Sequence, residues 1–384
     1  MGRTNSGTVR KRYPGKYEAR YTAPNGKRYS IYGSSEADVQ KKLRKALTSV
    51  DNGEYVEPSQ LTVGKWLDTW FTTYAQPILR ESTAAIHYEN IRLHLKPAFG
   101  KIELQKIRIE QIQQFVNKQN KKYAPSTIHK HMEPLQLALK QAVINKLITT
   151  SPMEGVKLPK MEHKEIQFLT KQEQEKLFAQ IPNTTSGRAI QFILATGLRA
   201  SEICGLQWQD IDNGVMHIRR GVQKVRSVDD NQTVERKLII ATPKTRAGQR
   251  PIPFFVQVNT LLERQRIEQI EQRLKAGSGW FGGDAGKGDT YVFATELGTP
   301  CDRNNLARSL RKMLDDAGLA HRGLHALRHT FATNAVQAGI DTRTLSEILG
   351  HTKVAFTMQQ YVHSNLETKK EAMRKMEGML QSER

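Results

Sequence analysis

Residue types that can act together on a phosphate ester occur within one stretch of the sequence, from Leu324 to Tyr361. His325 and Arg328 are three positions apart, so on a helix they would lie side by side. His351 follows a Leu-Gly pair, and Tyr361 comes ten positions later. A tyrosine near cations suits a nucleophile, and a phosphate is the target that the same cations would hold. A His-x-x-Arg pair is equally typical of solvated or capping residues, so the interpretation depends on the other motifs.

Two predicted helices position these side chains. Asp341 is a suitable N-cap for a helix that runs to Leu349 and ends at Gly350, which leaves His351 at the mouth of a site. The helix before it is predicted to be amphipathic from apolar residues at helical spacing, namely Leu324, Leu327, Phe331 and Ala335. We expect His329, on the same helix, to be structural.

Two upstream motifs add further charged residues. Arg199 closes the segment Thr-Gly-Leu-Arg, in which Gly197 suits the left-handed end of a helix predicted over residues 187–195. Arg199 therefore leaves the helix at a sharp turn. Glu202, three positions on, either orients Arg199 or is only an acid at a helix start. Lys244 lies in the stretch 242–248, which we predict to be a hairpin turn that leads to Arg250.

Composition limits the class of partner. The chain has 384 residues, which predicts two to three domains. Its 59 Lys and Arg residues against 38 Asp and Glu residues give a net charge of +21, which predicts a polyanionic partner such as nucleic acid. Two cysteines form no Cys-x-x-Cys unit, so neither a disulfide framework nor a zinc site is expected. No apolar run has membrane-spanning length and the first residues lack an apolar signal core, so we expect no membrane association and a cytoplasmic protein.

Residues 1–50 are predicted to form a small separate domain of three strands (8–12, 16–22 and 27–32) and one helix (34–47). An Asn-Gly pair marks one hairpin turn. Up to Leu47 there are twelve basic residues and three acidic ones, an excess of nine. Such clustering favours a sheet presented to a DNA groove over a merely solvated basic domain. The candidate DNA-binding residues here are Arg10, Arg12, Lys16, Arg20, Lys27 and Arg28.

Residues 51–60 are predicted to be a linker, and residues 61–160 a bundle of four helices (63–74, 82–95, 108–119 and 126–146). Lys121, Lys122 and Lys130 are candidate phosphate contacts in this bundle, although each alone is typical of a solvated lysine. Residues 166–384 have a mixed pattern with helices at 170–180, 187–195 and 254–274 and strands at 215–219, 222–226 and 237–241. The predicted fold class is therefore multidomain: a three-stranded sheet with a helix, an all-α bundle and a mixed α+β domain.

Two glycine-rich stretches do not indicate nucleotide binding. The segment from Gly277 to Gly282 matches Gly-x-Gly-x-x-Gly but follows a helix rather than a strand, so a dinucleotide site is not expected. Gly286-Lys287 lacks the spacing and the hydroxyl residue of a phosphate-binding loop. We expect a loop here and no use of ATP.

The ordered motifs at Arg199 to Glu202, Lys244, His325 to Arg328, His351 and Tyr361 resemble those of the tyrosine recombinase (phage integrase) family. The resemblance covers about residue 61 to the C-terminus. Each motif alone is weak, but their joint order is specific. Residues 1–50 resemble, more loosely, the arm-site-binding domain of integrases from conjugative transposons and temperate phages. Phe356 stands where this family often has a small polar residue, which concerns local packing rather than chemistry.

The resemblance implies a role for each residue. Tyr361 would attack DNA and form a 3′-phosphotyrosyl bond, while Arg199 and Arg328 would clamp the phosphate. Lys244 would protonate the leaving 5′-hydroxyl, His325 would act as acid and base, and His351 would hydrogen-bond the phosphate. Glu202 would support Arg199. The covalent bond conserves the phosphodiester energy, so no metal, ATP or other cofactor is expected.

The implied function is site-specific recombination that integrates and excises a mobile genetic element. The expected partners are double-stranded DNA at core and arm sites, three further copies of the chain in a DNA-bound tetramer, and accessory proteins such as an excisionase and a DNA-bending protein. A helix predicted over 365–380 would dock on a neighbouring copy, in trans. Two alternatives remain at this point: a type IB topoisomerase-like enzyme, and a catalytically inert DNA-binding regulator.

Overall fold

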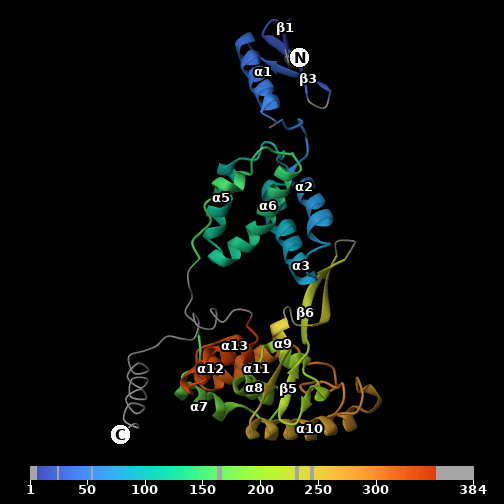
Figure 1. Cartoon of the computed structure of the whole chain (residues 1–384), viewed down its shortest axis with the longest axis vertical. Coiled ribbons are helices and arrows are strands. Elements are labelled where there is room, and N and C mark those ends of the chain that lie inside the picture. Colours follow the sequence, from blue (N-terminus) through green and yellow to red (C-terminus); the bar gives the residue numbers. More distant parts are fainter. Residues whose placement is uncertain are drawn as a thin grey trace, which may run out of the picture. The chain divides into compact units, whose positions relative to one another are not determined.

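The computed structural model describes residues 7–23, 26–52, 55–161, 167–229, 233–242 and 246–351 (Figure 1). The chain divides into two compact units, one of residues 1–163 and 226–235 and the other of residues 164–225 and 236–384. Lys244, Phe356, Tyr361 and the helix predicted over 365–380 lie outside the described residues. No helix among the described residues is long and apolar enough to span a membrane.

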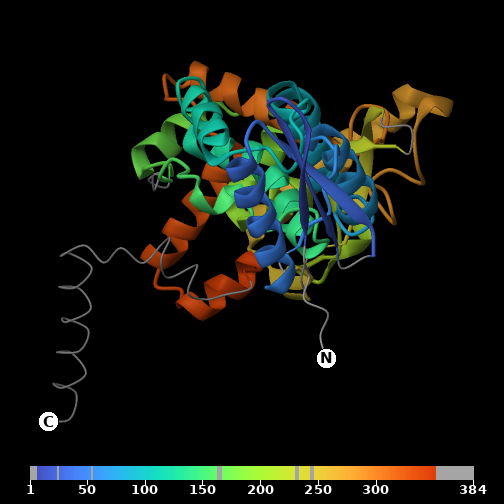
Figure 2. The same ribbon diagram turned by 90° about the horizontal axis from the view of Figure 1, so that it is seen from above.

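The first unit begins with an antiparallel sheet of β1 (Thr8–Tyr13), β2 (Lys16–Thr22) and β3 (Arg28–Gly33) in that order. Helix α1 (Glu36–Asp51) follows, and its N-cap Ser35 accepts a hydrogen bond from the backbone of Asp38. Figure 2 shows α1 lying across one face of this sheet. The small core between them consists of Ala19, Tyr21, Ala23, Val39 and Leu43.

Side chains along β2 alternate between a face that packs on α1 and a polar face. Ala19 and Tyr21 are buried against α1. Glu18 belongs to the opposite, polar face, yet it is 0% exposed. Side chains from all three strands cover its carboxylate, and sequence periodicity cannot predict that kind of burial because it reports only which face a residue is on.

Part of the segment predicted to be a linker packs against the sheet. Helix α1 extends to Asp51, four residues beyond the predicted end. The ring of Tyr55 contacts Tyr21 and Tyr29, with centroids 6.4 Å from each. Glu57 accepts hydrogen bonds from Tyr29 and Lys27.

A helical bundle follows in the same unit. Helix α2 (Val63–Trp70) continues into a π-helical turn (Phe71–Ala75), and α3 (Glu81–Asn90) continues through a second such turn (Ile91–Leu95) into α4 (Lys96–Phe99). Helices α5 (Ile109–Asn120) and α6 (Pro125–Ile144) complete the bundle. The indole of Trp66 donates to the Ala138 carbonyl at 2.8 Å, which ties α2 to α6 inside the core.

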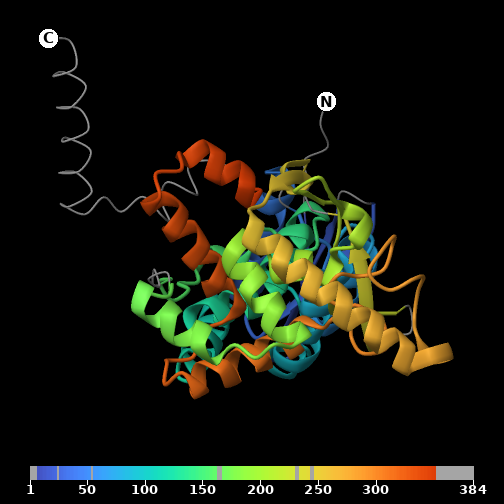
Figure 3. The same cartoon turned by 90° about the horizontal axis from the view of Figure 1, so that it is seen from below.

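The second unit is mixed. Its helices are α7 (Lys171–Gln180), α8 (Thr185–Thr196), α9 (Ala200–Gly205), α10 (Val256–Ala276), α11 (Arg303–Asp316), α12 (Leu324–Gln337) and α13 (Thr342–Leu349). Its strands are β4 (Ile211–Asp212), β5 (Val215–Ile218) and β8 (Arg250–Pro253). Two further strands, β6 (Gly221–Val228) and β7 (Val234–Ala241), belong to this unit except for residues 226–235, which belong to the first unit. Helix α8 runs through the core, and Figure 3 shows α10 alongside it. Cys204 and Cys301 are free thiols in this core with sulfur atoms 3.4 Å apart.

One strand connection differs from the prediction. The stretch 242–248 was predicted to be a hairpin turn, but the strands on either side of it belong to different sheets. β7 pairs with β6, whereas β8 pairs with β5 in the sheet β4-β5-β8. The strand β8 was not predicted because two of its four residues are prolines, which are rare inside strands. Helices α9 and α11 were also not predicted.

Candidate active site

The turn between α8 and α9 positions Arg199. Gly197 ends α8 with φ +66°, a left-handed conformation that favours glycine. A Cβ atom at Gly197 would also lie 2.3 Å from the Phe331 ring of α12, so the close approach of the two elements requires glycine too. Arg199 then becomes the N-cap residue of α9, as expected for an arginine that leaves the helix at a sharp turn.

Glu202 orients Arg199 rather than standing alone at a helix start. Its carboxylate accepts the backbone N–H of Arg199 at 2.9 Å and the Nη1 donor of the same residue at 2.8 Å. Arg199 Nη2 donates to the Gly350 carbonyl at 3.1 Å. The guanidinium is therefore held between α9 and the end of α13, with about a third of the side chain exposed to solvent.

Arg328 is 1% exposed and spans the same two turns. Its Nη1 donates to the Gly197 carbonyl at 2.8 Å, and its Nη2 to the Leu349 carbonyl at 2.6 Å. Nη2 also lies 3.0 Å from Nε2 of His351. Because arginine can only donate, His351 accepts through Nε2, and its neutral ring then carries the proton on Nδ1.

The histidines of this cluster favour the neutral form. Loss of solvation, and then the charges of Arg328 and Arg199, lower the pKa of His351 to about 3. The same two causes lower the pKa of His325 below its ordinary value. His329 packs edge-on against His325 at 4.7 Å, and burial lowers its pKa to about 4. A neutral imidazole can accept a proton, as a general base must.

Arg250 belongs to the same cluster and was not predicted to be a site residue. Its Nη1 and Nη2 lie 3.2 and 3.1 Å from the two oxygens of Glu202, and its side chain is 6% exposed. Further donors reach the carbonyls of Gly248 and Ile348. Arg250 and Arg199 keep the pKa of the buried Glu202 carboxyl below its ordinary value despite the opposing effect of burial. Its position directly after the predicted turn that contains Lys244 was the sequence signal for it.

Gly350 is packed as tightly as Gly197. It ends α13 with φ +65°, and a Cβ atom there would lie 2.8 Å from Nη1 of Arg250 and 2.9 Å from the Ala247 carbonyl. The turn 350–351 therefore fits only glycine at its first position. His351, the last described residue, donates its backbone N–H to Ser346.

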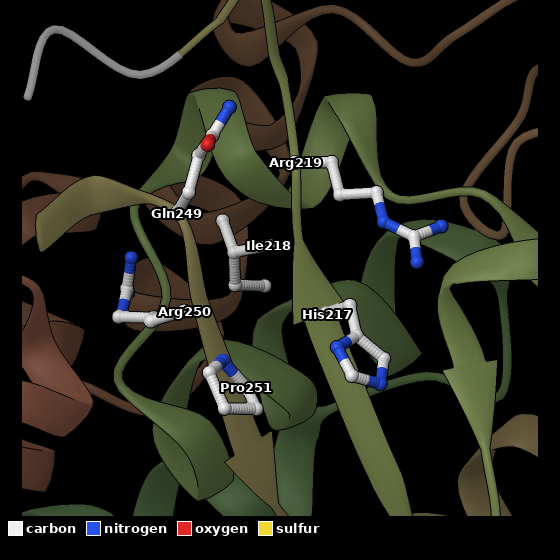
Figure 4. A pocket seen from close by; sticks show the side chains of 6 residues that line it. All are labelled: His217, Ile218, Arg219, Gln249, Arg250 and Pro251. Carbon is white, nitrogen blue, oxygen red and sulfur yellow. The ribbon is translucent and has the colours of Figure 1, made fainter. Parts of the chain in front are cut away.

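A pocket of about 380 Å³ lies next to this cluster. Figure 4 shows His217, Ile218 and Arg219 on one side of it and Gln249, Arg250 and Pro251 on the other. Only Arg250 of these six belongs to the cluster, and its guanidinium is engaged by Glu202. The site therefore rests on the two turns and not on this pocket.

The predicted site residues fall into three groups. Arg199, Glu202, Arg328 and His351 contact one another directly or through the two turns, and His325 contributes to the same electrostatic environment. Lys244 and Tyr361 lie outside the described residues. The nine candidate DNA-binding residues are all exposed and lie in the first unit: Arg10, Arg12, Lys16, Arg20, Lys27, Arg28, Lys121, Lys122 and Lys130.

The cluster can hold an anion with a fixed orientation. Arg199 and Arg328 present guanidinium groups that suit phosphate oxygens, and backbone carbonyls hold both groups in place. A buried carboxylate on the far side of Arg199 keeps it in position. Such preorganised donors are what stabilises charge developing on a phosphoryl group.

Sequence comparison assigns the family. Residues 167–368 match the phage integrase family, and residues 62–119 match its N-terminal SAM-like domain. The chain is 30% identical over 352 residues to a tyrosine recombinase XerC-like protein of Caldanaerobacter subterraneus subsp. tengcongensis, covering 88% of this chain and 89% of that one. The chain therefore belongs to the phage integrase family, and it is a tyrosine site-specific recombinase.

Solved structures show the same fold. The integrase of transposon Tn1549 in complex with a circular intermediate DNA superposes with a TM-score of 0.65 at 20% identity, covering 82% of this chain and 99% of that one. A lambda integrase tetramer bound to a Holliday junction gives a TM-score of 0.58 at 17% identity, covering 93% and 97%. The predicted multidomain fold class is thereby confirmed.

Proposed function

We propose that this chain is the integrase of a mobile genetic element, which cuts and rejoins double-stranded DNA through a covalent tyrosine intermediate. The observation that carries the proposal is the convergence of Arg199, Arg328 and His351 on two glycine turns, ten residues before Tyr361. Membership of the phage integrase family and similarity to transposon and phage integrases support it.

Cleavage in this proposal is a transesterification. The hydroxyl oxygen of Tyr361 attacks the phosphorus while Arg199 and Arg328 each neutralise a non-bridging oxygen. The bond to the 5′-oxygen breaks and a 3′-phosphotyrosyl bond forms. His325, whose lowered pKa leaves it neutral, accepts the tyrosine proton, and Lys244 donates a proton to the leaving 5′-oxygen. His351 hydrogen-bonds the phosphate, and rejoining reverses these steps.

The remaining parts of the chain would bind DNA. We assign residues 1–50 to arm-type sites, 51–60 to a linker, 61–160 to core sites and 166–384 to catalysis. The exposed basic residues on the sheet and bundle supply the phosphate contacts. Transesterification conserves the bond energy, so these roles involve no cofactor, and the protein would act in the cytoplasm, together with accessory proteins such as an excisionase and a DNA-bending protein.

Recombination between two duplexes involves four strand cuts, so we propose a homotetramer on DNA. The helix predicted over 365–380 would dock on the neighbouring copy and couple the active sites. The lambda integrase tetramer on a Holliday junction supports this assembly. Sedimentation of the DNA complex tests it, because complexes that never exceed two chains on synapsed sites would contradict a tetramer.

The variant Tyr361→Phe tests the central step. A duplex from the flank of the source element, nicked near the cleavage site, traps the covalent intermediate because the small fragment diffuses away. We expect the wild-type chain to form a covalent adduct and Tyr361→Phe to bind the duplex equally well and form none. An adduct with the variant would exclude Tyr361 as the nucleophile. No adduct with the wild-type chain favours an inert regulator, and relaxation of supercoils without strand exchange favours a topoisomerase.

A further inference from the structure

The open face of the N-terminal sheet is an organised array of charges. Because side chains alternate along a strand, the residues out of register with the Ala19 and Tyr21 core point away from α1. The strand register places Arg10 opposite Glu18 on one side and Tyr32 opposite Glu18 on the other. The polar side chains on this face include Arg10, Arg12, Glu18, Arg20, Arg28, Ser30 and Tyr32.

Three arginines converge on one carboxylate at the centre of this face. Nε atoms of Arg10, Arg12 and Arg20 lie 2.8, 2.9 and 3.0 Å from the oxygens of Glu18. The hydroxyl of Ser30 donates to the same carboxylate at 2.7 Å. We call these three arginines the arginine fan.

The arginine fan keeps a net positive charge and N–H donors that Glu18 does not use. Three guanidinium groups surround one carboxylate, so the cluster stays cationic. Each guanidinium carries five N–H donors. Because Arg12 and Arg20 contact Glu18 through Nε, their Nη donors remain for a second acceptor. The three side chains are between 45% and 52% exposed, while Glu18 is fully covered.

The fan is not needed to fill a core. The apolar core of this domain lies on the other face, against α1. The hydrogen bond from Ser30 first, and then Arg10 and Arg20, hold the pKa of Glu18 well below its ordinary value, so the carboxylate stays charged at neutral pH. A buried anion on an open basic face reduces the attraction of that face for phosphate. Attraction between charges therefore does not explain why Glu18 lies there.

We propose that Glu18 is a positioning residue that holds Arg10, Arg12 and Arg20 in one arrangement for reading a DNA groove. This inference rests on the proposed arm-site function. A β-ribbon fits the major groove, where an arginine fork pairs with two acceptors on a guanine edge. Arginines fixed in advance lose less side-chain entropy on binding and reject duplexes whose acceptors lie elsewhere. Glu18 therefore raises sequence discrimination and lowers affinity for DNA in general.

The test separates positioning from charge. The full chain with Tyr361→Phe selects duplexes from a random-sequence pool. Duplexes that this chain retains, and that the same chain without residues 1–50 does not, become the arm-type probes. Glu18→Gln is then compared with Glu36→Gln in the same background. Both variants remove one negative charge from the domain, but Glu36 lies exposed in the first turn of α1, away from the fan.

Both variants should bind an unrelated duplex somewhat more tightly, because each adds one unit of positive charge. Glu18→Gln alone should lose about tenfold in preference for the arm-type probe over the unrelated duplex, about the loss of one bidentate base contact. Glu18→Asp, which keeps the charge, should recover part of that preference. Hydrogen exchange of the β1–β3 amides should be the same in wild type and Glu18→Gln.

The other outcomes overturn the inference. If Glu18→Gln prefers the arm-type probe over the unrelated duplex as strongly as Glu36→Gln does, the carboxylate does not position the arginine fan. If the strand amides of Glu18→Gln exchange much faster, Glu18 is structural instead. If no selected duplex requires residues 1–50, the arm-site function itself is wrong, and the inference falls with it.

Discussion

Among the described residues, arginines surround a buried glutamate at Glu202 and at Glu18, and the two clusters are built differently. Around Glu202, Arg199 and Arg250 also donate to the main-chain carbonyls of Gly350, Gly248 and Ile348. Their neighbour Arg328 donates to the carbonyls of Gly197 and Leu349. Around Glu18, the described bonds of the arginine fan run to side chains. The first cluster is fixed by the fold itself and suits one phosphate in one place. The second is fixed by a single carboxylate, which in our proposal holds exposed donors in one arrangement for a DNA groove.

The largest effect should follow from loosening the rigid cluster. Arg199→Lys keeps the charge but removes the planar fork that reaches both Glu202 and the Gly350 carbonyl. We expect cleavage to slow by about a hundredfold or more, in the range for loss of one transition-state donor, with DNA binding nearly unchanged. Single-turnover adduct formation measures the rate. Arg343→Lys, on the exposed face of α13, is the matched control. Cleavage of Arg199→Lys at half the wild-type rate would remove Arg199 from the site.

A smaller effect is expected at Arg250, whose guanidinium is engaged by Glu202 and by the carbonyls of Gly248 and Ile348. In Arg250→Met, Glu202 should pair with Arg199 alone. This stronger pairing should keep the Arg199 guanidinium from reaching the phosphate. We expect cleavage to slow by roughly tenfold, in keeping with the loss of a positioning contact. DNA affinity should not change.

Arg219→Met is the control for Arg250→Met, since Arg219 lines the same pocket and pairs with Asp210. Cleavage and affinity that fall together in both variants would point to a general loss of stability. A double variant with Glu202→Gln sharpens the assignment. If Arg250 acts through Glu202, its substitution should have little further effect when that carboxylate is gone.

The smallest effect concerns acid stability. Burial and neighbouring arginines lower the pKa of His351 to about 3, against an ordinary value near 6.5, so the folded state binds fewer protons than the unfolded one between these values. Stability of the second unit should therefore fall as pH falls from about 6.5 towards 3. Residues 7–52 contain no histidine, and Glu18 contributes stability that is lost only below about pH 4.5.

Urea unfolding by pulse proteolysis, with fragments assigned to each unit, measures this difference. Between pH 7 and pH 5 we expect the midpoint of the second unit to fall by about 0.5 M, a loss of about 1 kcal/mol, while the sheet domain changes less. His351→Gln should reduce the fall. Equal shifts in the sheet and in the second unit would contradict the assignment to the histidine cluster.

The sequence predicted the elements that carry local signals. The helix-ending glycines at 197 and 350, the N-cap at Asp341 and the three strands of the N-terminal sheet depend on neighbouring residues alone. The described parts of these elements lie where expected. For Glu202 the sequence left two alternatives, a partner of Arg199 or an acid at a helix start, and the structure shows the contact with Arg199.

Contacts between distant segments could not be predicted. Arg250 meets Glu202 across 48 positions, and no periodicity in one sequence records such a pairing. The burial of Glu18 likewise depends on side chains from three strands that cover it, although the residue lies on the polar face of the sheet. The pairing of β8 with β5 instead of β7 is a third case, since strand order is a property of the whole sheet.

The Gly350 carbonyl links two parts of the candidate site. It accepts a hydrogen bond from Arg199, the residue proposed to receive the scissile phosphate, and Gly350 precedes Tyr361 by eleven positions in the sequence. In our proposal, a phosphate oxygen and this carbonyl draw on the donors of one guanidinium. Phosphate binding and the geometry of the Gly350 turn are then coupled, so a substitution that displaces this carbonyl should also change the affinity for the phosphate.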